Sequence, residues 1–327
     1  MLRQRIFAGL LVMALALSLF AAPATAAGAD KTFAAPRSTS GEPVEVPKGY
    51  NVNDFTKLSA FLETTDGNGV KNGAKLSESY HPADPSTWGS AVQWTELDGE
   101  MRLLRIDAVS TGLSGSLDLS GCAALEKLNL SNNSLTKLDV SGDGALLSLA
   151  CNSNQLTELT LSGNGKLSSV ECYRNRLTSL DFSDAVRLST LFCYENQLTS
   201  LLIPQCTRLR NLYCGQNQLS ALDVSACTNL YSLSCSVNEL TALDVSQNPG
   251  LTMLVCGANP IAELDLSANT ALTTLYCNDS RLTQLHLDHL TRLSTLLCYN
   301  NQITDLTLST VTTILRCSDN PLGELNV

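Results

Sequence analysis

Hydrophobic residues recur through most of this chain with a period of 21 residues. Counted from the residue that opens each repeat, leucine usually stands at the fourth, eleventh and fourteenth positions, and an aliphatic residue or phenylalanine at the sixteenth. The two-residue spacing between the fourth and sixth positions, and between the fourteenth and sixteenth, predicts short strands whose alternate side chains point inward. A coil of this length cannot bury those side chains alone, so the pattern predicts stacked coils.

Ten repeats fit this pattern. The tenth begins two residues early at Thr312, and an irregular forerunner near Leu104 keeps only a second half, LDLS, at Leu117–Ser120. The expected fold is a mainly β or α/β solenoid of about ten coils with parallel strands, over residues 104–327. The nine regular repeats begin at Leu125, Leu146, Leu167, Leu188, Leu209, Leu230, Leu251, Leu272 and Leu293.

The consensus LxxLxCxxNxLxxLDLSxxxx carries a family resemblance. Its first half resembles the leucine-rich repeat, and the 21-residue form with two similar halves and a cysteine at the sixth position resembles the nested bacterial subclass called IRREKO. The resemblance covers two thirds of the chain. It implies a curved or twisted solenoid with one parallel strand per repeat and a role as a binding scaffold, but it names no ligand.

Twelve cysteines follow the same period. In-register neighbours project parallel Cβ atoms about 4.8 Å apart, beyond the usual disulfide separation, and a linear ladder does not converge on a metal ion. We therefore expect small buried hydrophobic residues, with a disulfide between Cys206 and Cys227 as the alternative at the looser turn. Nine stand at the sixth position, Cys151, Cys172, Cys193, Cys214, Cys235, Cys256, Cys277, Cys298 and Cys317, and three at the nineteenth, Cys122, Cys206 and Cys227.

Two polar rows accompany the cysteines. An asparagine at the ninth position of nine repeats is expected to satisfy backbone groups of its own coil and the next one, and Ser280 is the exception. Aspartates at the fifteenth position are expected on a solvated face, where the serine at the seventeenth can bond them. Calcium is the alternative, although one carboxylate per coil supplies few of its six to eight oxygens. The aspartates are Asp118, Asp139, Asp181, Asp223, Asp244 and Asp265.

The first 26 residues predict secretion. Arg3 and Arg5 precede an apolar run from Ile6 to Phe20, and small residues follow up to Ala26. This is the layout of a signal peptide, here cleaved after Ala26, and the apolar run is short for the alternative, an uncleaved anchor helix. No later segment is expected to enter a membrane. Residues 27–49, rich in Ala, Pro, Ser and Gly, are expected to form a flexible leader.

Residues 50–103 are expected to cap the first coil, because an open solenoid exposes apolar side chains at its end. A helix beginning near Val52 would place four apolar residues on one face, with Asn53 or Asp54 as its cap. Sugar binding by the tryptophans is the alternative. The apolar residues of the cap are Phe55, Leu58, Phe61, Leu62, Trp88 and Trp94.

The charge and the motifs exclude several functions. The chain has 31 acidic and 21 basic residues, and removing the signal peptide with Arg3 and Arg5 leaves 31 against 19, a net charge of −12. This balance argues against nucleic acid and anionic membranes as partners. Three histidines, including His286 and His289 in HLDH, supply no metal triad, and no GxSxG, HExxH or phosphate-binding loop occurs. No catalytic residue, metal or cofactor is expected.

Binding residues are expected at the outward third, fifth, seventh and eighth positions. Aromatic side chains with an arginine are typical interface anchors, although aromatics are also favoured simply as strand formers. The predicted function is a secreted, non-enzymatic scaffold for protein recognition at a cell surface or envelope. A glycan-binding module and a fragment of a larger extracellular protein are the alternatives. The candidate residues are Tyr173, Arg174, Phe192, Tyr194, Tyr213, Tyr276 and Tyr299.

The carboxyl-terminal coil raises a separate expectation. Val327 occupies an inward position of the tenth repeat, and no polar cap follows it. Apolar coil ends are association sites. The sequence therefore predicts either end-to-end self-association through this coil or a longer protein whose next repeat covers it.

Overall fold

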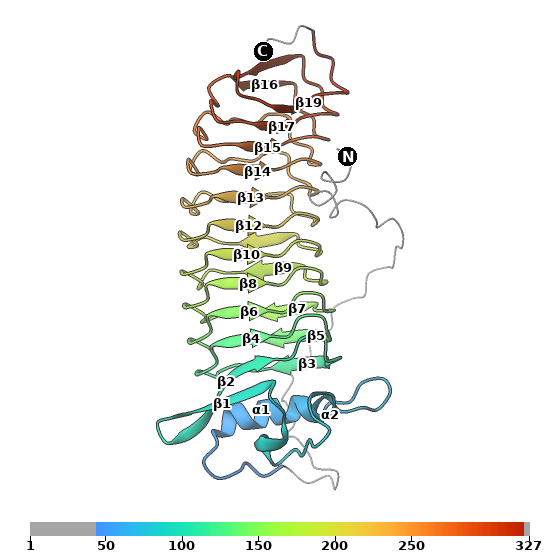
Figure 1. Cartoon of the computed structure of the whole chain (residues 1–327), viewed down its shortest axis with the longest axis vertical. Helices are drawn as coiled ribbons and strands as arrows, with labels where there is room; N and C mark the ends of the chain where they lie inside the picture. The colour runs from blue at the N-terminus through green and yellow to red at the C-terminus, as the bar shows by residue number, and fades with distance from the viewer. Residues whose placement is uncertain (1–43, 324–327) are drawn as a thin grey trace, which may run out of the picture. The chain divides into compact units, whose positions relative to one another are not determined.

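The computed structural model describes residues 44–323, and coils of 21 residues stack through most of this part (Figure 1). Each coil carries a strand at its third to fifth positions. The predicted signal peptide, Leu325 and Val327 lie outside the described residues. The main strands are β1 (Val92–Leu97), β2 (Glu100–Asp107), β4 (Lys127–Asn129), β6 (Ser148–Ala150), β8 (Ser169–Glu171), β10 (Thr190–Phe192), β12 (Asn211–Tyr213), β13 (Ser232–Ser234), β14 (Met253–Val255), β15 (Thr274–Tyr276), β17 (Thr295–Leu297) and β19 (Ile314–Arg316).

These twelve strands form one sheet in the order given. Only β1 and β2 pair antiparallel; from β2 onward the pairs are parallel and in register, as Leu191 opposite Leu212 shows. The register survives the two-residue shortening before the tenth repeat, since Leu296 still lies opposite Leu315. The predicted solenoid of parallel strands is confirmed.

The second halves of the coils form shorter sheets, β3-β5-β7, β11-β9 and β16-β18. Their strands are β3 (Ser114–Asp118), β5 (Ser134–Asp139), β7 (Glu158–Thr160), β9 (Ser179–Asp181), β11 (Ser200–Leu202), β16 (Gln284–Leu287) and β18 (Asp305–Leu308). The expectation of a strand in every second half was wrong for 221–224, 242–245 and 263–266. Two of these segments begin with alanine, which has a low strand propensity.

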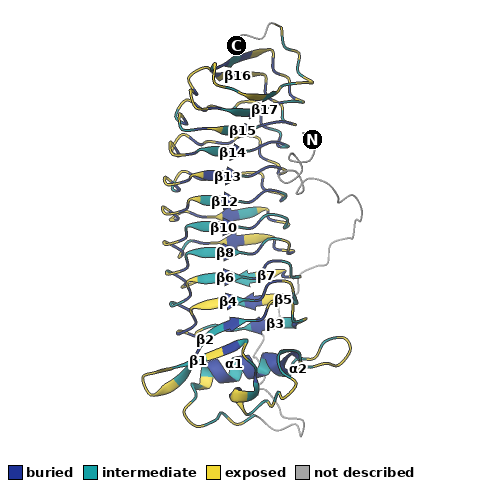
Figure 2. Ribbon diagram, viewed as in Figure 1, coloured by how far each residue is buried: buried dark blue, intermediate teal, exposed yellow. Residues whose placement is uncertain are grey.

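One hydrophobic core runs from the cap through the coils, and exposed residues gather at the turns (Figure 2). The cysteines belong to this core: eleven are buried and Cys317 is half-buried. All twelve lie in the described residues, and none is paired, including Cys206 and Cys227. Burial raises the pKa of the Cys214 thiol to about 12, so the thiol stays protonated at neutral pH.

The cysteine ladder makes a measurable prediction. Mass spectrometry of the unfolded, alkylated and unreduced mature protein should find nearly all twelve thiols free. Cys214→Ser should lower the free energy of unfolding by about 1–3 kcal/mol, because it buries a hydroxyl in an apolar core. Cys214→Val, the matched control, should cost less. Several disulfides within the sixth-position set would contradict this account.

The asparagine ladder joins each coil to the coil before it. Asn196 Nδ2 donates to the carbonyl oxygens of Cys193 in its own coil (3.1 Å) and of Cys172 in the preceding one (3.0 Å). Its Oδ1 accepts from the backbone N–H of Leu177, also in the preceding coil, at 3.1 Å. The predicted backbone role is confirmed, but the neighbour it joins is the preceding coil and not the next one.

The aspartate row is bonded locally. In each of its six members the carboxylate accepts from the backbone N–H of the serine two residues later, as Asp181 does from Ser183 at 2.8 Å. The Ser183 hydroxyl and then its backbone N–H lower the pKa of Asp181. These carboxylates therefore act as turn residues on the outer side of the coil.

The cap contains α1 (Val52–Glu63), α2 (Asn72–Leu76) and a 3-10 helix (Pro85–Thr87). The four predicted apolar residues of α1 are buried, but the cap residue of this helix is Asn51, whose side chain accepts from Asp54 N at 3.2 Å. The predicted cap, Asn53 or Asp54, was wrong, because Asp54 is buried in an ion pair with Arg102 (2.8 Å). Val44 and Val46, placed in the leader by composition, pack partly against the core.

The tryptophans support the core of the cap. Trp88 is 0% exposed, and its indole N–H donates to the carbonyl oxygen of His81 at 2.9 Å. Trp94 is partly buried and packs edge-on against Tyr50, with ring centroids 5.0 Å apart. The alternative of sugar stacking was therefore wrong for Trp88, whose ring has no exposed face.

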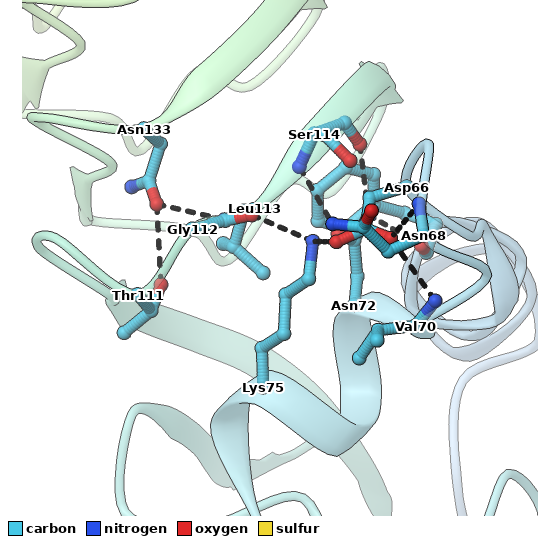
Figure 3. Close-up of polar contacts among 11 residues, drawn as sticks. Asp66, Asn68, Val70, Asn72, Lys75, Thr111, Gly112, Leu113, Ser114 and Asn133 are labelled. Atoms are coloured by element: carbon cyan, nitrogen blue, oxygen red, sulfur yellow. Dashed lines mark hydrogen bonds and ion pairs between the residues drawn. The ribbon is translucent and has the colours of Figure 1, made fainter.

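Polar contacts fasten the cap to the start of the solenoid (Figure 3). Asn72 Nδ2 donates to the carbonyl oxygen of Ser114 (2.9 Å), while Ser114 N donates back to Asn72 Oδ1 (3.0 Å). Lys75 Nζ donates to the carbonyl oxygen of Gly112 (2.7 Å) and pairs with Asp66 (3.0 Å). Backbone groups at the first residue of β3 and just before it are thus satisfied by the cap.

Candidate functional site

The outward side chains of β8, β10 and β12 carry the densest group of candidate binding residues. Phe192 and Tyr213 are the last residues of β10 and β12 and lie opposite one another in register. Tyr173 and Tyr194 stand two residues beyond the ends of β8 and β10. We call these four side chains the aromatic patch. All four are part-exposed, whereas the inward residues between them are buried, as the two-residue alternation predicts.

The aromatic patch consists of two stacked ring pairs. The ring centroids of Tyr173 and Tyr194 lie 4.5 Å apart with 7° between their planes, and those of Phe192 and Tyr213 lie 4.8 Å apart at 20°. Parallel in-register strands repeat about every 4.8 Å, so residues 21 positions apart are held at stacking distance. The spacing of the sheet thereby orients the rings before any ligand arrives.

The hydroxyl groups of Tyr194 and Tyr213 differ in their surroundings. Burial, followed by the neighbouring Tyr173, raises the pKa of Tyr194 to about 12. The Ser232 hydroxyl, on β13, donates to the Tyr213 hydroxyl at 3.3 Å. The Tyr194 hydroxyl therefore stays protonated at neutral pH, and the Tyr213 hydroxyl accepts a hydrogen bond from the next coil.

Arg174 lies beside the aromatic patch but is already paired. Its Nε donates to Glu195 Oε2 at 2.9 Å, and both side chains are partly exposed. Both residues adopt a positive φ, 55° and 54°, at the turn that follows the strand. An exposed ion pair is worth about 0–1 kcal/mol, so Arg174 stays available to a partner carboxylate.

Tyr276 and Tyr299 lie apart from the aromatic patch. Tyr276 ends β15, three coils beyond Tyr213, and Tyr299 follows β17 in the next coil. The intervening fifth positions carry Ser234 and Val255. The structure thus brings five of the seven candidates together and leaves two on a separate part of the same strand face.

Sequence reasoning missed the partners of these residues. Glu195 and Ser232 bond to members of the candidate set but were not among it. The pairing of rings was also missed, although its signal is present in the sequence as aromatic residues 21 positions apart, at 173 and 194 and at 192 and 213.

Residues 44–323 give little support for a metal site or a membrane-spanning helix. In this part of the chain, no three His, Cys, Asp or Glu side chains lie close enough together to hold a metal ion. His286 stands on β16, and His289 beyond it places Nε2 3.2 Å from the carbonyl oxygen of Leu266. Within the same range, no helix has the length and apolar character needed to cross a membrane.

Comparison with protein-family models and with curated proteins finds no match. Solved structures do match. YopM from Yersinia enterocolitica is 25% identical over 68% of this chain and 57% of that chain, with a TM-score of 0.53. YopM from Yersinia pestis, a leucine-rich effector protein, is 22% identical over 66% and 64%, with a TM-score of 0.54.

A third structure, the functional domain of InlJ from Listeria monocytogenes, includes a cysteine ladder. It is 29% identical over 64% of this chain and 59% of that chain, with a TM-score of 0.40. This chain spans less than two thirds of the length of each of the three proteins. Its own coils and parallel strands, together with the YopM structures, give the fold: the chain is a leucine-rich-repeat solenoid with a 21-residue period, similar to bacterial leucine-rich-repeat proteins.

Proposed function

We propose that this chain is a secreted, non-enzymatic scaffold that binds another protein through the aromatic patch. The observation that carries the proposal is the pair of ring stacks on outward strand positions. Aromatic side chains dominate the energetic centres of protein interfaces. Rings that are oriented before binding lose little conformational entropy when a partner covers them.

Secretion rests on the predicted signal peptide, residues 1–26, outside the described residues. The IRREKO-like form of the repeats supports a bacterial origin. Recognition then takes place at a cell surface or envelope, where a secreted scaffold meets its partners. Self-association through the last coil is a further proposal, supported by Ile314, which is 52% exposed there.

A glycan is the second candidate ligand. Tyr173 and Tyr194 are part-exposed rings stacked with 7° between their planes, and exposed aromatic rings also accept the apolar faces of sugar rings. Tyr213, in the coil after Tyr194, adds a part-exposed ring with a hydroxyl group. The protein-ligand and glycan-ligand hypotheses predict different outcomes in the same experiment.

The test is site-specific photocrosslinking. A benzophenone amino acid replaces Tyr173 in the mature chain, and the control chain carries it at Tyr231, which is 53% exposed outside the aromatic patch. Both chains are exposed to intact cells and screened on a glycan array. The proposal expects a discrete protein crosslink from position 173 only. Equal crosslinking from 231 would remove the patch as the site, and array binding with no protein crosslink would establish the glycan instead.

A further inference from the structure

The nineteenth position of several coils faces a backbone carbonyl oxygen of the preceding coil. Three buried asparagines at this position donate from Nδ2 to the carbonyl oxygen 24 residues earlier, at 2.9, 3.1 and 3.0 Å. Their Oδ1 atoms are buried without a partner. At these three positions the surroundings therefore accept a hydrogen bond from the side chain and donate none to its oxygen. The three residues are Asn164, Asn248 and Asn269.

Asp143 occupies this position in the first coil. It is 0% exposed, and neither carboxyl oxygen has a hydrogen-bond partner. The carbonyl oxygen 24 residues earlier belongs to Leu119, which accepts from Cys122 N at 3.0 Å and keeps a second lone pair. A carboxylate has no hydrogen to donate there, whereas a protonated carboxyl group has one.

We infer that Asp143 is a neutral carboxylic acid that donates to a backbone carbonyl oxygen as the asparagines do, and that its loss of a proton loosens the first coil and its junction with the cap. The backbone N–H of Cys122 is the neighbouring donor, and it is already bonded to Leu119. If the carboxyl group were ionised, its charge would be buried with no hydrogen-bond donor to compensate it.

The charged groups around Asp143 agree with this protonation state. Lys57 on α1 is the neighbouring cation, but it pairs with Asp118 at 2.9 Å. Asp54 on α1 pairs with Arg102, and Asp139 belongs to the same coil. Burial raises the pKa of Asp143 to about 8; Asp54 and Asp139 add to the rise, while the Cys122 amide and Lys57 oppose it. The thiol of Cys122 also has a raised pKa, chiefly through burial, and stays uncharged.

The sign of the pH dependence follows from these values. The carboxyl group has a pKa of about 4 in the unfolded chain and a higher one when folded, so the folded chain binds one more proton between the two. The stability from Asp143 is full below the unfolded pKa and is lost as pH rises through the folded value of about 8. Within this window the folding equilibrium constant falls about tenfold per pH unit.

The experiment compares urea unfolding of the mature chain and its Asp143→Asn variant from pH 5 to pH 9. The amide donates at every pH, so the variant should lack the tenfold loss per unit and exceed the wild type at pH 8. Asp139→Asn is the matched control: it makes the same substitution in the same coil, at a carboxylate that accepts from Ser141 N at 2.8 Å. This control should keep the wild-type slope.

Parallel pH curves for the wild type and Asp143→Asn, or a variant less stable at pH 8, would overturn the inference. Hydrogen exchange locates the effect: after correction for the intrinsic, base-catalysed exchange rate, amides of coil one and the cap should be less protected at pH 9 than at pH 6 in the wild type, and equally protected at both pH values in Asp143→Asn. Infrared spectroscopy at pH 6 provides a readout independent of folding stability. A protonated carboxyl band present in the wild type and absent from the variant is expected, and its absence from the wild type contradicts the inference.

Discussion

Replacing Tyr173, Phe192, Tyr194 and Tyr213 together by serine should remove most of the affinity for the protein partner and leave the fold intact. Each ring is part-exposed, and the inward residues of the same strands remain to hold the coils together. A single anchor of this kind costs about 2 kcal/mol or more when truncated, roughly a 30-fold loss of affinity. The free energy of binding lost by this quadruple variant should be smaller than the sum of the four single losses, because stacked rings in contact are not independent.

The measurement is the dissociation constant for the crosslinked partner, with circular dichroism as the check on folding. The matched control removes Tyr276 and Tyr299, which lie on the same strand face outside the aromatic patch. It should bind like the wild type. If the control loses affinity and the quadruple variant keeps it, the binding site lies on the coils of β15 and β17 instead.

Asn217→Ala should destabilise the solenoid by about 3–5 kcal/mol, because it leaves the buried Leu198 N–H without a partner, at a cost of about 1–3 kcal/mol, and each further hydrogen bond lost costs about 1 kcal/mol. Asn217 Nδ2 donates to the carbonyl oxygens of Cys193 (3.1 Å) and Cys214 (3.0 Å), and Oδ1 accepts from Leu198 N (2.9 Å). Alanine removes these three bonds and a fourth, from Nδ2 to the carbonyl oxygen of Gly215 (3.2 Å), in the middle of the stack. Urea unfolding, followed by circular dichroism, measures the change.

The chain carries its own control for the asparagine ladder. Ser280 stands where nine other repeats have asparagine, and its hydroxyl makes one weak bond, to the carbonyl oxygen of Asn278 at 3.4 Å. Ser280→Asn should therefore raise the free energy of unfolding by about 1 kcal/mol, the net value of a hydrogen bond regained. A cost below 1 kcal/mol for Asn217→Ala together with no gain for Ser280→Asn would show that the ladder contributes little.

Some features could not be predicted from the sequence, because they depend on contacts between residues that lie far apart in it. Asp54 carries the expected residue type for a helix cap, yet it pairs with Arg102 on β2, and Asn51 caps α1. Asp143 lies in the turn segment SGDG, and only the packing of the folded chain buries its carboxyl group. Local propensity does not predict such partners, because they come together only when the chain packs into its tertiary structure.

The sequence by itself determined the size of the coil, the inward positions, the burial of the cysteines and the backbone role of the asparagines. These features follow from spacings of two and 21 residues, which recur in the successive repeats. Tertiary structure alone decided that Tyr173 stacks on Tyr194, that three second-half strands are missing, and that Trp88 is buried. Periodicity specifies which way a side chain points, whereas its contacts depend on the register and rotamers of neighbouring coils.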